Sequence, residues 1–202
     1  MRLCSGESNA WLTPSFNGTT RVTKPPMLVW LHMLSWLDLT PATSTTDQLI
    51  LRARLVSVTL ALLALASTFW LGLTLADCKL AVLATMIAGS NILLKRQARF
   101  ASYDIHLTAW ATLSVAAALW AIGPCGPAPR KRRQVFGWGL AGVGLAMAWL
   151  SKGPLALAIV GLPMVGAIAV LPGRRMANAV RLCASVVLAA VLAMPWYLYI
   201  RL

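Results

Sequence analysis

Charge is scarce in this sequence, and negative charge is the scarcest. Charged residues make up 11% of the 202 residues, with five acidic side chains against 18 basic ones, while 59% of the residues are hydrophobic. A soluble domain of this size carries about a quarter charged residues. The composition therefore excludes an ordinary soluble domain and indicates a protein that lies within a membrane.

Cysteine patterns and a signal peptide are lacking as well. Cys4, Cys78, Cys125 and Cys183 do not have the spacing of a metal site, and they fall in different loops or spans. They therefore predict neither a zinc motif nor a disulfide framework. Residues 1–26 are polar and contain no signal-peptide hydrophobic region. We expect this segment outside the bilayer or at its surface.

Long runs without charge dominate the rest of the chain. Most of them approach the ~20 residues needed to cross a ~30 Å hydrocarbon core. The shortest, 80–94, either spans the membrane with Lys79 and Lys95 reaching outward or forms a re-entrant segment. The sequence thus predicts an all-α, polytopic transmembrane bundle of about six spans. The runs are 55–76, 80–94, 105–123, 135–151, 153–173 and 182–200.

Two strongly basic loops predict the orientation of the bundle. PRKRRQ (129–134) and GRRMANAVR (173–181) are separated by two apolar runs, so they share one side. The positive-inside rule places that side in the cytoplasm. Alternation then places residues 1–54, KRQARFASYD (95–104) and SKGP (151–154) on the opposite face.

Positive charge is in excess on this extracytoplasmic face. Its acids number at most four, namely Glu7, Asp38, Asp47 and Asp104, and they cannot neutralise ten cations. In a soluble protein a net charge of +13 would suggest binding to nucleic acid, but here no nucleic-acid partner is expected. The cations are Arg2, Arg21, Lys24, Arg52, Arg54, Lys95, Arg96, Arg99, Lys152 and Arg201.

An anion held at the membrane interface is the simplest partner for these cations. Lys24, Arg96, Arg99 and Lys152 lie within about a turn of predicted membrane boundaries. A lipid phosphate fits, because lysine and arginine bind phosphate through charge-assisted hydrogen bonds. The alternative is that these side chains merely snorkel to the headgroups.

The segment KPPMLVWLHMLSWLDL (24–39) predicts a short external interfacial helix over 25–38. Pro26 suits the first turn of a helix, and the apolar stretch after it is too short to span the membrane. Such a helix would present Lys24 at membrane height. His32 is expected to be an ordinary interfacial residue, since no second histidine lies nearby in the sequence. We divide the chain into this external segment, 1–54, and a transmembrane bundle, 55–202.

The segment FGWGLAGVGLAMAWL contains a G-x-G-x-x-G pattern at Gly137, Gly139 and Gly142. A dinucleotide-binding fingerprint requires a strand before it and a helix after it. Here the pattern lies inside an apolar run, and Gly142 with Ala146 has the small-xxx-small spacing of packed membrane helices. The pattern therefore predicts close helix packing.

Asp104 is a candidate functional residue because a carboxylate at a membrane boundary is costly unless it is paired or hydrated. It begins the run 105–123, with Thr108 on the same helical face. The alternative is an acid at a helix N-terminus, favoured by the helix dipole. Lys152 precedes Gly153-Pro154 and is expected in a tight hairpin on the extracytoplasmic face.

Five segments in order resemble the membrane glycosyltransferases of the GT-C fold, in the branch of protein mannosyltransferases and the aminoarabinose transferase. They run through nearly the whole chain, which would then be a partial GT-C domain. The segments are WLTPSFNGTTRVTKPPMLVWL (11–31), LRARLVSVTLALLAL (51–65), RQARFASYDIHLT (96–108), AMAWLSKGPLAL (146–157) and MPWYLYI (194–200).

The resemblance implies a chemistry and a place for it. Such enzymes pass a sugar from a polyprenyl-phosphate donor to an acceptor lipid or protein outside the cytoplasm, and they are multi-pass proteins of the plasma (bacterial inner) membrane. It implies that Lys24 and Lys152 lie near the donor phosphate and that Asp104 orients Lys24 or an external-loop group at the catalytic centre. We add Arg96, Arg99 and Tyr103 to the expected donor-phosphate site and name no metal ligand.

The sequence also departs from the family pattern. Family members begin with a membrane helix and an external Asp-Glu pair, which Glu7 does not match in position, and they carry Asp or Glu where Thr23 stands. A divalent metal is possible in the family, but its ligand positions are missing or changed here. We therefore expect the amino-terminal portion of such an enzyme. An anionic-lipid flippase or a non-catalytic membrane remnant are the alternative functions.

Overall fold

The computed structural model describes residues 15–16, 19–20, 24–38, 44–125, 129–171 and 175–201. Within them the fold is almost entirely helical, as predicted, with one small antiparallel hairpin. The elements are β1 (Ser15–Phe16), β2 (Thr19–Thr20), α1 (Met27–Ser35), α2 (Thr46–Leu75), α3 (Cys78–Ser90), α4 (Ile92–Arg99), α5 (Tyr103–Ile122), α6 (Lys131–Lys152), α7 (Leu155–Val170) and α8 (Arg175–Arg201).

Two helix boundaries are set by capping hydrogen bonds at positions that the hydrophobicity of the sequence does not predict. The helix α2 begins at Thr46, well before the apolar run at 55, because Thr45 and Gln48 form a reciprocal capping box. The run 80–94 is divided at Asn91, whose side chain accepts hydrogen bonds from Leu93 and Leu94 and so starts a new helix.

The described helices differ in their capacity to cross a membrane. Four of them, α2, α5, α6 and α8, are long and apolar enough, and α3 with α4 forms a further pair bent by 62°. The helix α7 is apolar but only 16 residues long. A polytopic helical bundle is thus confirmed, with four or five candidate spans by length and composition where about six were expected.

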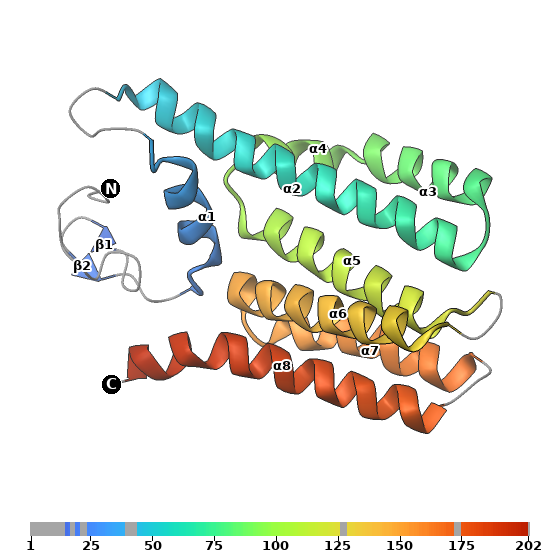
Figure 1. Ribbon diagram of the computed structural model, residues 1–202. Coiled ribbons are helices and arrows are strands. Elements are labelled where there is room, and N and C mark those ends of the chain that lie inside the picture. Colours follow the sequence, from blue (N-terminus) through green and yellow to red (C-terminus); the bar gives the residue numbers. More distant parts are fainter. Residues whose placement is uncertain are drawn as a thin grey trace.

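The helices α5 and α6 form the centre of the bundle (Figure 1). The helix α2 packs on the other side of α5, with α3 and α4 beyond it. The helix α8 packs against α6, and α7 packs against both α5 and α6. The short helix α1 lies across one end of the bundle, where it contacts α2, α5 and α6. We call this end the α1 end.

Glycines on α6 allow the neighbouring helices to approach closely, which confirms the packing predicted from the glycine pattern. A Cβ atom at Gly137 would lie 2.7 Å from the Ala121 Cβ and 2.9 Å from the Ala117 carbonyl oxygen on α5. A Cβ at Gly142 would lie 3.0 Å from the Ser185 carbonyl oxygen on α8. Small residues permit such contact in membrane bundles.

Gly137→Ala is therefore expected to destabilise the bundle by about 1–3 kcal/mol, because the added methyl group overlaps α5 backbone. Gly139→Ala is the matched control, since a Cβ there meets nothing within 4 Å. It should be neutral, or stabilising by up to ~1 kcal/mol through helix propensity. Denaturant unfolding in mixed micelles measures both. Equal effects of the two substitutions would contradict this packing.

Candidate functional site

The first side of the candidate site is the start of α1. Lys24 precedes two prolines, and the Pro26 carbonyl accepts a hydrogen bond from the Trp30 amide, so the helix begins directly after them. Met27 is buried and packs in one cluster with Leu150 of α6 and Trp196 of α8. This packing fixes α1 across the end of the bundle and leaves Lys24 exposed there.

The second side is the start of α5, which carries Tyr103 and Asp104 in its first turn. The Ser102 hydroxyl accepts a hydrogen bond from the Asp104 amide at 3.2 Å and caps the helix. The carboxylate of Asp104 is therefore placed at the positive end of the helix dipole. The segment before the cap is tied to α2, because the Ser57 hydroxyl donates to the Phe100 carbonyl at 2.9 Å.

The third side is the hairpin between α6 and α7, as predicted from Lys152-Gly153-Pro154. Gly153 ends α6 with φ 75° and ψ −154°, a backbone conformation that favours glycine. Pro154 then caps α7. Lys152 is the last residue of α6, where the negative end of the helix dipole favours a cation.

The side chains from these three segments meet at the α1 end. The Lys152 ammonium forms an ion pair and hydrogen bond with the Asp104 carboxylate. The Lys24 Nζ lies 4.7 Å from the centroid of the Tyr103 ring, a cation–π contact. Lys152 pairs with the carboxylate and Lys24 lies over the neighbouring tyrosine ring, so these two cations and one carboxylate carry a net positive charge.

The ion pair is open to solvent. The Lys152 and Asp104 side chains are 44% and 45% exposed, so the contact is weak by the standard of buried ion pairs. An incoming anion can therefore compete for the Lys152 ammonium at little cost. The structure brings together Lys24, Tyr103, Asp104 and Lys152 out of the residues expected at the site.

Arg96 and Arg99 are not joined to this cluster by a described contact. Both lie in the last turn of α4, and both are exposed. The helix dipole favours their charges at that position, which is the structural alternative to a ligand role. Glu7 and Thr23, which bear on the departures from the family pattern, lie outside the described residues.

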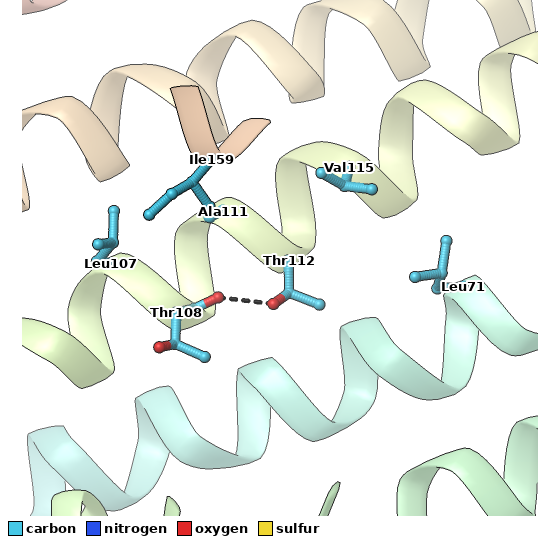
Figure 2. A pocket seen from close by; sticks show the side chains of 7 residues that line it. All are labelled: Leu71, Leu107, Thr108, Ala111, Thr112, Val115 and Ile159. Carbon is cyan, nitrogen blue, oxygen red and sulfur yellow. Dashed lines mark hydrogen bonds between the residues drawn. The ribbon is translucent and has the colours of Figure 1, made fainter. Parts of the chain in front are cut away.

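A small cavity begins one helical turn beyond Asp104 (Figure 2). It has a volume of about 310 Å³ and lies between α2, α5 and α7. The hydroxyls of Thr108 and Thr112 donate to carbonyl oxygens one turn back on α5, so their hydrogen-bonding capacity is largely used within the helix. The cavity is therefore mostly apolar. Its lining residues are Leu71, Leu107, Thr108, Ala111, Thr112, Val115 and Ile159.

Sequence reasoning did not identify two of the residues that hold the site. The Ser-x-Asp pattern at 102–104 was a usable capping signal for Ser102. The contact of Trp196 with Met27 and Leu150 joins distant segments, so no local pattern could predict it. No group of three or more His, Cys, Asp or Glu side chains gathers anywhere in the described part of the chain.

The ion pair itself should contribute little stability. A double-mutant cycle with Asp104→Asn and Lys152→Gln is expected to give a coupling energy of about 0.2–1 kcal/mol, because both side chains are nearly half exposed. The coupling should decrease further in 1 M salt, where screening is strong. Unfolding in mixed micelles measures it. A coupling of several kcal/mol would mean that the pair is a structural element rather than an exchangeable contact.

Comparison with known proteins identifies relatives over almost the whole chain. A family model described as dolichyl-phosphate-mannose-protein mannosyltransferase matches residues 9–202. Proteins named undecaprenyl phosphate-alpha-4-amino-4-deoxy-L-arabinose arabinosyl transferase are similar as well. Those of Pectobacterium carotovorum subsp. carotovorum and Pectobacterium atrosepticum are each 27% identical over 195 residues, and that of Pseudomonas fluorescens is 29% identical over 204 residues.

These alignments cover 95–96% of this chain but 32% of each relative, so the chain spans about a third of their length. No solved structure matches the chain.

Proposed function

The chain belongs to the dolichyl-phosphate-mannose-protein mannosyltransferase family, and on that premise we propose that it carries the donor-phosphate site of a membrane glycosyltransferase. The proposed reaction passes a sugar from a polyprenyl-phosphate donor to an acceptor, a lipid or a protein, on the extracytoplasmic side. The names of its relatives, which contain undecaprenyl phosphate and a sugar, support this class of donor.

The observation that carries the proposal is the meeting of Lys24, Asp104 and Lys152 at one end of the bundle. They come from three segments that are far apart in the sequence. Tyr103 adds the link between them, because its ring lies under Lys24 while its neighbour Asp104 pairs with Lys152. A phosphate at this place can take charge-assisted hydrogen bonds from two lysines that approach from different segments of the chain.

The chemistry of transfer accounts for two preformed cations. The acceptor oxygen bonds to the anomeric carbon of the sugar while the bond from that carbon to the phosphate oxygen breaks. The bonding electrons stay on the phosphate, and the acceptor proton passes to a base. Negative charge therefore grows on the leaving phosphate, and cations held there stabilise the transition state more than the ground state.

Asp104 serves in this proposal as the counter-ion that orients Lys152. Without a donor, the carboxylate holds the ammonium over the start of α5. When a phosphate arrives, the half-exposed pair can open and the ammonium can turn to the ligand. This assigns Asp104 a positioning role and agrees with its fixed place at the capped helix end.

The cavity that begins one helical turn after Asp104 can hold the part of the polyprenyl chain nearest the phosphate. It begins at Leu107 and Thr108 and continues along α5 to Val115, with Ile159 of α7 on another wall. A polyprenyl chain is apolar and fits such a lining. A donor whose phosphate lies at Lys152 can therefore direct its chain between α5 and α7 toward the bilayer.

The distribution of basic residues favours an extracytoplasmic α1 end. Arg130, Lys131, Arg132 and Arg133 lie at the opposite end, at the start of α6. By the positive-inside rule this opposite end faces the cytoplasm. We therefore propose that Lys24, Asp104 and Lys152 face the outside of the bacterial inner membrane.

Lys152→Ala should weaken the binding of undecaprenyl phosphate about 10- to 100-fold, because a hydrogen bond to a charged group contributes about 1.5–3 kcal/mol. Lys24→Ala should act in the same direction. The purified chain in nanodiscs of neutral lipid, titrated with undecaprenyl phosphate, gives the affinities.

Lys131→Ala is the matched control, since it removes one exposed cation from the opposite end of the bundle. Its affinity should stay within about twofold of the unsubstituted chain. If Lys131→Ala weakens binding as much as Lys152→Ala does, the interaction depends on overall charge and the assigned site is wrong.

Thiol labelling tests the proposed orientation. One variant lacks Cys4, Cys78 and Cys183 and keeps the exposed Cys125 near the basic end. A second variant also lacks Cys125 and carries Ala101→Cys, which places an exposed thiol between α4 and α5. With Ala101→Cys as the only thiol, a membrane-impermeant maleimide should label intact spheroplasts. With Cys125 as the only thiol it should label only lysed ones, and the reverse pattern would invert the assignment.

A further inference from the structure

The two histidines of the chain lie against each other where α1 crosses α5. His32 is 4% exposed and His106 is 0% exposed, and their ring centroids are 5.9 Å apart. The sequence contains only these two histidines. The expectation for His32 rests on the lack of a second histidine nearby in the sequence, but the fold places His106, which is distant in the sequence, beside it.

Backbone contacts fix the same tautomer in both rings. The His32 Nδ1 lies 2.5 Å from the Leu28 carbonyl oxygen, and the His106 Nδ1 lies 2.9 Å from the Ser102 carbonyl oxygen. A carbonyl oxygen only accepts hydrogen bonds, so each Nδ1 is the donor. In the neutral rings each Nε2 is then an acceptor. Both Nε2 atoms are buried and lack a hydrogen-bond partner in the described part of the chain.

The surroundings oppose a charge on this pair. Burial lowers the pKa of His32 below its usual value of 6.5, and the Leu28 carbonyl and the nearby Ala53 backbone offset part of this effect. A proton on one ring would place a positive charge directly beside the other.

Other ionisable groups on the elements packed against α1 have their own contacts or lie exposed. Arg52 of α2 pairs with Asp38 at 2.6 Å, and Asp104 of α5 pairs with Lys152 of α6. No described carboxylate is in contact with either imidazole. The other ionisable groups on α2 and α5 are Asp47, Arg54 and Tyr103, and Lys24 and Tyr197 lie at the α1 end. The helix α6 carries Lys131, Arg132 and Arg133 at its far end, and α4, which packs against α5, carries Lys95, Arg96 and Arg99.

We propose that His32 and His106 form a proton-binding site, which holds α1 against α5 while both rings are neutral and releases α1 when one ring is protonated. The helix α1 begins just after Lys24. Its release would therefore withdraw Lys24 from the Tyr103 ring. This consequence for the phosphate site rests on the proposed function, whereas the release of α1 does not.

The direction of the pH dependence follows from the lowered pKa of His32. The folded, docked state binds fewer protons than the released state, so the docking is fully favoured above pH 6.5. It is lost progressively as the pH falls below 6.5 toward the pKa of the docked ring. Acid should release α1, and alkali should not.

Selective labelling reads the pair directly. Because the chain has two histidines, ¹⁵N-histidine labelling in nanodiscs gives four ring nitrogen signals. We expect both rings to be protonated at Nδ1 at pH 7.5 and His32 to titrate with a midpoint below its usual pKa of 6.5. An ordinary midpoint near 6.5 for His32, or protons on Nε2 at pH 7.5, would overturn the proposal. Micromolar Zn²⁺ that binds both Nε2 atoms at pH 7.5 would identify a metal site instead and would overturn it as well.

Hydrogen exchange of α1 measures the release. After correction for the intrinsic pH dependence of exchange, amides of residues 27–35 should exchange at least about tenfold faster at pH 5.0 than at pH 7.5, because the released state binds more protons than the docked state. The double variant His32→Gln and His106→Gln should lose this pH dependence. Asp47→Asn, which removes an exposed carboxylate on α2, is the control and should keep it.

Neither measurement involves a sugar donor, so a failure of the proposed transferase activity leaves the test intact. An α1 exchange rate that does not change between the two pH values in the unsubstituted chain would overturn the proposal without reference to any variant.

Discussion

The close packing of α5 against α6 is the constraint on which the arrangement of the site depends. It brings the last residue of α6 to the first turn of α5, where Lys152 pairs with Asp104. In this packing the backbone of α5 lies close to glycines of α6, and the Ser114 hydroxyl donates to the Ala141 carbonyl at 2.7 Å. The apolar centre of the bundle thus decides where the charged groups at its end can lie.

A second constraint is the position of α1. This helix is too short to be stable alone, and it is held by the burial of Met27 against Leu150 and Trp196 and by the contact of His32 with His106. The packing of Met27 places Lys24 beside the start of α5. The contact of His32 with His106 buries two ionisable side chains. The cations of the proposed site therefore come from α6 in the centre of the bundle and from the residue just before α1, whose docking we propose to depend on protons.

The sequence allowed much of the fold to be predicted, because apolar runs of membrane length are a strong signal. Boundaries that depend on capping were missed. Thr45 caps α2, which therefore begins before the apolar run, and Asn91 divides the run 80–94 into two helices. Charge placement indicated that Lys24 and Lys152 share a side, but it could not indicate that Asp104 pairs with Lys152. The histidine pair was missed for the same reason, since such contacts depend on the packing of helices that are distant in the chain.

The central claim is that this end of the bundle holds the phosphate of a lipid-linked sugar donor between two lysines. An experimental structure of the chain with bound undecaprenyl phosphate tests it most directly. The account predicts phosphate oxygens about 2.7–2.9 Å from the Nζ atoms of Lys24 and Lys152, with the Lys152–Asp104 contact loosened and the lipid chain entering the cavity along α5. A phosphate bound elsewhere, with Lys152 still on Asp104, would contradict it.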